Sequence, residues 1–115
     1  MLARSDDIAK VEAARDELLD LLYEVLGAYA AGDADLSALV HDVDSVIIEL
    51  TLLSDPVWIE NMRNQWTALA RALLAHTRAG SWVPTEPERD RIAAATQGLL
   101  FLADVCPAVA RPSAA

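Results

Sequence analysis

The chain has 115 residues, of which 54% are hydrophobic and 23% charged, and its formal net charge at pH 7 is −9. A chain of this length is typical of one domain, and so much apolar side chain excludes an intrinsically disordered protein. The negative charge argues against nucleic acid as a partner, because proteins that bind the phosphate backbone carry the opposite sign.

The first predicted helix spans residues 6–30. Ser5 is suited to be its N-cap, and Gly32 is a stop signal just beyond its end. Arg15 falls near the apolar side of this helix, where an arginine usually reaches water or pairs with a carboxylate. Apolar residues recur along the helix at its own period: Ile8, Val11, Leu18, Leu22, Val25, Leu26 and Tyr29.

The second predicted helix spans residues 36–53, with Asp33 or Asp35 as its N-cap. Ile48 and Leu52 form an apolar stripe on its outward face, and this stripe and an outward apolar face on the fourth helix are more than so small a domain is expected to expose. Its inward face is a row of apolar residues at alternating spacings of three and four: Leu36, Leu39, Val43, Val46, Leu50 and Leu53.

The third predicted helix begins at Asp55-Pro56, an N-cap followed by proline in the first helical position, and stops at Gly80. Thr85-x-x-Glu88 is a capping-box pattern that starts the fourth helix, which we expect to run to Cys106, before Pro107. The third helix has one apolar face: Ile59, Met62, Trp66, Leu69 and Leu73.

Four helices of roughly 20–25 residues joined by short turns favour antiparallel neighbours. The expected fold is therefore all-α, an antiparallel up-down-up-down four-helix bundle. We expect one domain over residues 1–106 and a frayed tail rich in alanine and proline over residues 107–115.

The fourth helix is apolar nearly all round, which is typical of a helix covered on more than one side. No helix is central in a four-helix monomer, so the extra apolar face indicates contact with another chain or, alternatively, with the C-terminal tail folded back over Phe101. We expect a homodimer that forms through this helix, with Gly98, Leu100 and Phe101 at the interface.

Acidic residues gather on the second helix and the turns at its two ends. Residues 33–55 contain six acidic residues and no lysine or arginine, and Asp35, Asp42 and Glu49 lie seven apart on one side of the helix. These carboxylates either flank the core and pair with Arg63, or form a docking strip for a basic protein, with Ile48 and Leu52 as its apolar contacts.

Few residues in the chain are suited to catalysis or metal binding. The single cysteine, Cys106, excludes an internal disulfide and a cysteine-based zinc site. Neither His41 nor His76 has a glutamate three residues before it, as di-iron bundles require. The four glycines are dispersed and form no phosphate-binding loop. We therefore expect no metal and no cofactor.

No apolar run approaches the ~20 residues that cross a bilayer. The charged N-terminal segment 1–10 lacks the apolar core of a secretory signal peptide. These features predict a cytoplasmic protein that does not enter membranes.

One short segment suggests chemistry. Arg71-Ala72-Leu73-Leu74-Ala75-His76 matches an Arg-x4-His pattern, and in these six residues the chain resembles the HEPN ribonucleases, a family of small, dimeric, all-helical proteins. The resemblance implies a site at a dimer cleft in which Arg71 binds the scissile phosphate and His76 transfers a proton.

Three functional hypotheses follow. The first is a non-enzymatic interaction module that binds or masks a basic protein, as immunity proteins, antitoxins and secretion chaperones do. The second is an HEPN-like ribonuclease that uses Arg71 and His76. The third is a structural subunit of a larger assembly, which predicts a larger defined oligomer.

Overall fold

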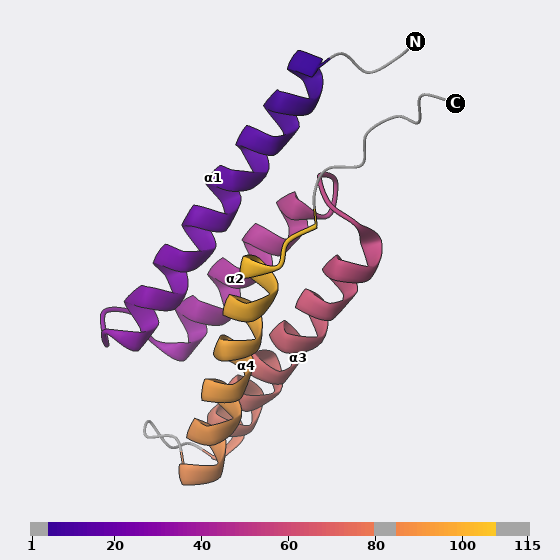
Figure 1. Ribbon diagram of the computed structural model, residues 1–115. Coiled ribbons are helices and arrows are strands. Elements are labelled where there is room, and N and C mark those ends of the chain that lie inside the picture. The colour runs from indigo at the N-terminus through magenta and orange to yellow at the C-terminus, as the bar shows by residue number, and fades with distance from the viewer. Residues whose placement is uncertain (1–4, 80–84, 108–115) are drawn as a thin grey trace.

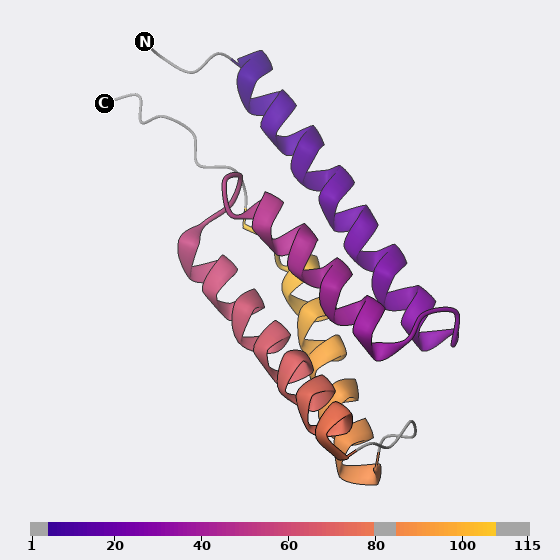
Figure 2. The same cartoon turned by 180° about the vertical axis from the view of Figure 1, so that it is seen from behind.

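The computed structural model describes residues 5–79 and 85–107, which form four α-helices and, within these ranges, no β-strand. Each helix runs in the direction opposite to the one before it along the chain (Figures 1 and 2). The all-α prediction is confirmed. The loop at 80–84 and the predicted frayed tail beyond residue 107 lie outside the described ranges. The helices are α1 (Ser5–Ala30), α2 (Leu36–Leu50), α3 (Pro56–Ala79) and α4 (Glu86–Asp104).

The predicted N-caps of the last three helices are present. In each case the side-chain oxygen accepts a hydrogen bond from a backbone N–H in the first turn, where the helix itself offers no acceptor. The three bonds run from Ala38 N–H to Asp35 at 2.8 Å, from Trp58 N–H to Asp55 at 3.2 Å, and from Glu88 N–H to Thr85 at 3.4 Å. Gly32 follows the end of α1 with φ of 82°, a conformation that favours glycine.

Two helices end earlier than the sequence predicts. α2 stops at Leu50, because the chain turns there and the N–H of Leu53 donates to the carbonyl of Leu50 at 2.9 Å. α4 stops at Asp104, two residues before the predicted end at Cys106. As a consequence Val105, whose position in a longer helix would face the core, is half exposed.

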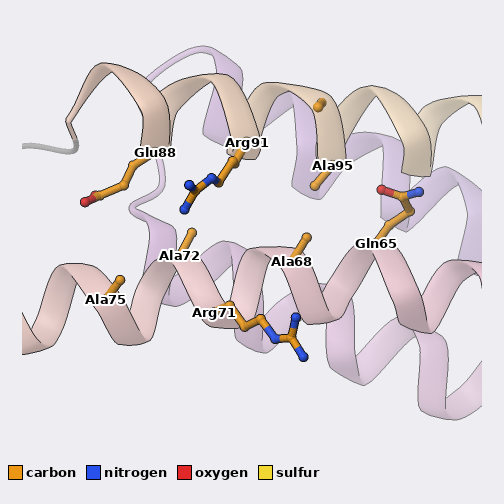
Figure 3. Close-up of a pocket in the computed structure, with 9 residues that line it drawn as sticks. Gln65, Ala68, Arg71, Ala72, Ala75, Glu88, Arg91 and Ala95 are labelled. Carbon is orange, nitrogen blue, oxygen red and sulfur yellow. The ribbon is translucent and has the colours of Figure 1, made fainter.

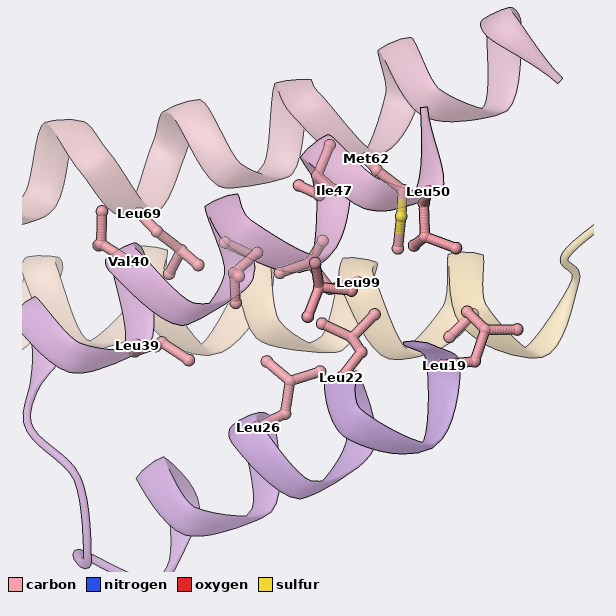
Figure 4. Packing of buried hydrophobic residues seen from close by; sticks show 14 of the residues in the cluster. Leu19, Leu22, Leu26, Leu39, Val40, Ile47, Leu50, Met62, Leu69 and Leu99 are labelled. Carbon is pink, nitrogen blue, oxygen red and sulfur yellow. The ribbon is translucent and has the colours of Figure 1, made fainter. Parts of the chain in front are cut away.

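The core forms where all four helices overlap. Each helix contributes side chains that meet in one cluster (Figure 4), and burial of each large apolar side chain contributes about 1.5–3 kcal/mol to stability. The predicted inward residues of α2 through Leu50 are all buried, as are those of α3 at Ile59, Met62 and Leu69. The largest fully buried side chains are Leu22, Leu39, Ile47, Leu50, Met62, Leu69 and Leu99.

The helices overlap only in part. α2 has 15 residues, whereas α1 has 26 and α3 has 24, so the molecule extends 57 Å along its longest axis and 24 and 19 Å across. α3 and α4 share the most extensive contact, and α1 and α4 share the least. None of the described side chains between residues 7 and 14 is fully buried. The first half of α1 therefore has little contact with the other helices.

Two tryptophans anchor α3 on both of its sides. The indole N–H of Trp58 donates to the carbonyl of Leu102 in α4, and the indole N–H of Trp66 donates to the carbonyl of Val40 in α2, both at 2.8 Å. Each bond satisfies an indole donor that is removed from water, so both rings can bury their apolar bodies without an unpaired polar group.

α1 is joined to the end of α4 by two polar contacts. The hydroxyl of Tyr23 donates to Asp104, and the guanidinium of Arg15 donates to the carbonyl of Pro107 at 2.6 Å. Arg15 lies near the core as predicted, but its partner is a backbone carbonyl rather than a carboxylate. Because the last turn of α4 has no basic residue of its own, Arg15 supplies the positive charge that stabilises a helix C-terminus.

Candidate interaction surface

The outward side of α2 carries two neighbouring rows of residues. Ile48 is 55% exposed and Leu52, in the turn after the helix, is 89% exposed. Asp42 and Glu49 are exposed as well. Consecutive residues of a helix are about 100° apart, so Ile48 and Glu49 place the apolar and acidic rows side by side. We call Asp42, Ile48, Glu49 and Leu52 the α2 outer face.

The acidic residues of this region have different roles. Asp35 uses one carboxylate oxygen to cap α2, as one of the two N-caps that the sequence allowed. The expected partner of the strip, Arg63, instead pairs with Asp44 at 2.5 Å and lies over the ring of Trp66 at 5.1 Å. Within the described residues Asp42 and Glu49 have no ion-pair partner. Their charges are therefore available to another molecule.

The three residues predicted to form an interface on α4 point in three different directions. Leu99 points into the core, so Gly98 turns toward α3, where a Cβ atom would lie 2.7 Å from the side chain of Gln65. Leu100 turns the other way and packs partly against the core. Phe101 points outward and is 64% exposed. Gly98 thus belongs to the α3–α4 contact, and Phe101 alone is largely exposed.

A second exposed apolar region lies where α3 begins and α4 ends. The bond from Trp58 to Leu102 holds these two segments together. Beside it are Val57, which is 65% exposed, and the exposed side chains of Phe101 and Val105. Val57 was not among the residues predicted from the sequence. Its position one residue before the buried Trp58 turns it out of the core, and this spacing is the signal that could have identified it.

A groove of about 450 Å³ runs between α3 and α4. Alanine methyl groups from both helices form its floor, and charged side chains lie along its edges (Figure 3). In the close-up the guanidinium of Arg91 points toward α3, whereas that of Arg71 points away from α4. The groove is lined by Gln65, Ala68, Arg71, Ala72, Ala75, Glu88, Arg91, Ala94 and Ala95.

The two residues of the Arg-x4-His pattern share α3. Arg71 is exposed at the groove, and the side chain of His76 lies outside the described part of the structure. The helix continues without a break from residue 71 to residue 76, so the two positions are about 140° apart around its axis. Within one chain, the helix directs these two positions to different sides.

The lone thiol has the properties of a core residue. Cys106 is partly buried, and this burial raises its pKa, while the charge of Arg15 lowers it and that of Asp16 raises it. A raised pKa keeps the thiol protonated near neutral pH, and a thiol is a weaker nucleophile than a thiolate. Cys106 is therefore poorly suited to nucleophilic chemistry.

No family model, no curated protein and no solved structure matches this chain. Among the described residues there is no group of three or more metal-binding side chains, and no helix is long and apolar enough to cross a membrane. Function must therefore be argued from the surfaces described above.

Proposed function

We propose that this chain is a non-enzymatic, cytoplasmic protein-interaction module. In this proposal residues 1–106 form one acidic, antiparallel up-down-up-down bundle that binds a basic protein through the α2 outer face. The bundle also associates with a second copy of itself on the α4 side of the molecule. The observation that carries the proposal is the exposure of Ile48 and Leu52 beside two carboxylates that lack ion-pair partners in the described residues.

The two rows of the α2 outer face have different physical effects. The carboxylates of Asp42 and Glu49 attract a basic surface and select its orientation, which chiefly raises the rate and specificity of encounter. Ile48 and Leu52 then lose water against apolar groups of the partner, and full burial of each contributes about 1.5–3 kcal/mol. Binding of this kind masks the partner's surface and requires no chemistry.

A structural subunit of a larger assembly is the second candidate. The observation that favours it is the apolar region formed by Val57, Phe101 and Val105, which lies on elements other than α2. A protein that exposes apolar side chains on several elements is able to join two neighbours. This candidate predicts a larger oligomer of fixed size that forms without a foreign protein, whereas the first predicts a complex with one foreign basic protein.

The first candidate can be tested by site-specific crosslinking in the cells that make the protein. A photo-crosslinking amino acid at position 52 should capture one basic protein in high yield. Charge reversal of Asp42 and Glu49 to lysine in the same chain should abolish that product, because a basic partner is then repelled.

The matched control places the crosslinking amino acid at Glu60, an exposed position on α3. It should capture little of the protein seen from position 52. Equal capture from both positions, or capture that survives charge reversal, would show that the α2 outer face is not the binding surface.

A further inference from the structure

The arginines at the α3–α4 groove have no partners although the chain is rich in carboxylates. Within the described residues neither Arg71 nor Arg91 makes a hydrogen bond or an ion pair. Both line the groove, one on each helix. Arg15 and Arg63, in contrast, are both bonded. Because Glu88 also lines the groove, the formal charge of the groove is +1, and its two arginines are left without a partner in the described residues.

The charge of the chain is unevenly divided along its length. Residues 1–55 contain thirteen acidic and three basic residues, a formal charge of −10. Residues 56–115 contain five acidic and six basic residues, a formal charge of +1. A second copy of the chain thus provides an acidic half that complements the groove in charge.

One exposed face of α1 carries several of these carboxylates. Ala13, Asp16, Asp20, Glu24 and Gly27 follow one another at spacings of three and four, so they share one side of the helix. All five are exposed, and a Cβ atom placed on Gly27 would meet nothing within 4 Å. We call these residues the α1 outer face.

Small residues on both surfaces allow two helices to come close together. Helix axes pack 8–10 Å apart, depending on the side chains between them. The alanines at 68, 72 and 94 place little volume in the groove, and on α1 the small residues Ala13 and Gly27 stand at the two ends of the row of carboxylates. The carboxylates on α1 can then reach Arg91, whose guanidinium points toward α3, and Arg71 on the outer edge of α3 (Figure 3).

We propose that the α3–α4 groove binds the α1 outer face of a second copy of this chain, with Arg71 and Arg91 pairing with Asp16, Asp20 and Glu24. The proposal rests on the self-association proposed above and assigns its two surfaces. Groove and α1 outer face are different surfaces, so the contact is heterologous: every copy has one of each, and copies join head to tail into a ring or a chain.

Sedimentation velocity of the full chain at low and high ionic strength tests this contact. The wild-type chain should associate at low salt and dissociate at high salt, because exposed ion pairs are screened. Arg91→Glu and Asp20→Arg should each weaken association at least about tenfold. The matched control is Arg89→Glu, which makes the same charge change two residues away from Arg91 at an exposed position that does not line the groove.

Mixing the two reversal variants provides a second readout. Arg91→Glu retains a native α1 outer face, and Asp20→Arg retains a native groove, so together they can form one native contact. The mixture should give a heterodimer that neither variant forms alone. Circular dichroism of each variant should match the wild type, since all three positions are exposed.

Three results would overturn the proposal. If Arg91→Glu and Arg89→Glu weakened association equally, or if the mixture gave no heterodimer, the groove would be excluded as the binding surface. Self-association through another surface would remain possible. A chain that is monomeric at every protein and salt concentration would exclude both the groove contact and self-association. Crosslinking from the α2 outer face to a foreign protein is a separate readout, and none of these three results would change what it shows.

Discussion

The two halves of the molecule build one core but differ in charge and in anchoring. α1 and α2 belong to the half with a formal charge of −10, and α3 and α4 to the half with +1. α3 is held on both sides by partly buried indole hydrogen bonds, whereas α1 makes two side-chain hydrogen bonds to the end of α4 and the residues after it. All of the excess negative charge therefore lies on the half that holds α1 and α2.

The largest expected effect contrasts the shared core with the surface of the molecule. Met62 in α3 is fully buried, so Met62→Ala should lower the free energy of unfolding by about 2–5 kcal/mol through lost burial and a cavity. Leu21 in α1 is 43% exposed, and Leu21→Ala should cost no more than about 0.5 kcal/mol. Urea denaturation of both variants provides the measurement, and similar losses would refute the contrast.

A smaller loss of stability is expected when the hydrogen bond from the Trp58 indole is removed and an aromatic ring is retained. Trp58→Phe leaves the carbonyl of Leu102 without its donor in a partly buried site, which should cost about 1–3 kcal/mol. Tyr23→Phe removes a bond at the surface between α1 and α4 and should cost less than about 1 kcal/mol. Thermal and urea unfolding would contradict the account if Tyr23→Phe proved the more destabilising change.

The contrast in charge predicts which half binds the basic partner. Reversal of Asp42 and Glu49 to lysine should weaken binding at least about tenfold, or about 1.4 kcal/mol, at low salt. Reversal of Glu86 and Asp90 on α4 makes the same change in net charge on the other half and should leave binding nearly unchanged. Calorimetric titration of each variant with the purified basic partner provides the measurement. Equal weakening by both pairs of substitutions would indicate a general effect of net charge rather than a local binding strip.

A modest pH effect is expected at the contact between α1 and α4. The hydrogen bond to Asp104, with burial and the charges of Asp104 and Asp20, raises the pKa of Tyr23 from 10.0 to about 12. An unfolded chain loses this proton first, so the stabilisation present below pH 10 is lost as pH rises through 12. Tyr23→Phe should flatten the fall in stability above pH 10, and an unchanged slope would assign the fall to other groups.

The smallest effect is expected for His76→Ala, the substitution that tests the ribonuclease hypothesis. Because positions 71 and 76 lie about 140° apart on α3 and the chain is acidic, purified protein should not cleave RNA. His76→Ala should then behave as the wild type on a broad panel of RNAs. Cleavage without metal that His76→Ala abolishes would require a catalytic role for the pattern.

Local sequence signals predicted most of the helices. Asp35, Asp55 and Thr85 marked helix starts because a cap bond involves residues only three apart. The rows of apolar residues in α2 and α3 predicted the core because burial follows the helical period. The ends of α2 and α4 were less predictable, since the apolar pattern continues past the last helical turn.

Contacts between distant residues were beyond the sequence patterns. The partner of Arg15 is a backbone carbonyl 92 residues away, and no composition or period identifies it. The direction of Gly98 depends on the rotation of α4 against α3, which the packing of Leu99 determines. The groove forms for the same reason, because alanines on two helices meet only once their relative rotation is fixed.

The most direct test of the central claim is native mass spectrometry of the untagged protein, purified gently from the cells that make it. The account predicts a complex of this chain with a basic protein in fixed proportion, and loss of that protein when Asp42 and Glu49 are replaced by lysine. A chain recovered without any partner, or a partner retained after the replacement, would contradict the assignment of the α2 outer face as a binding surface.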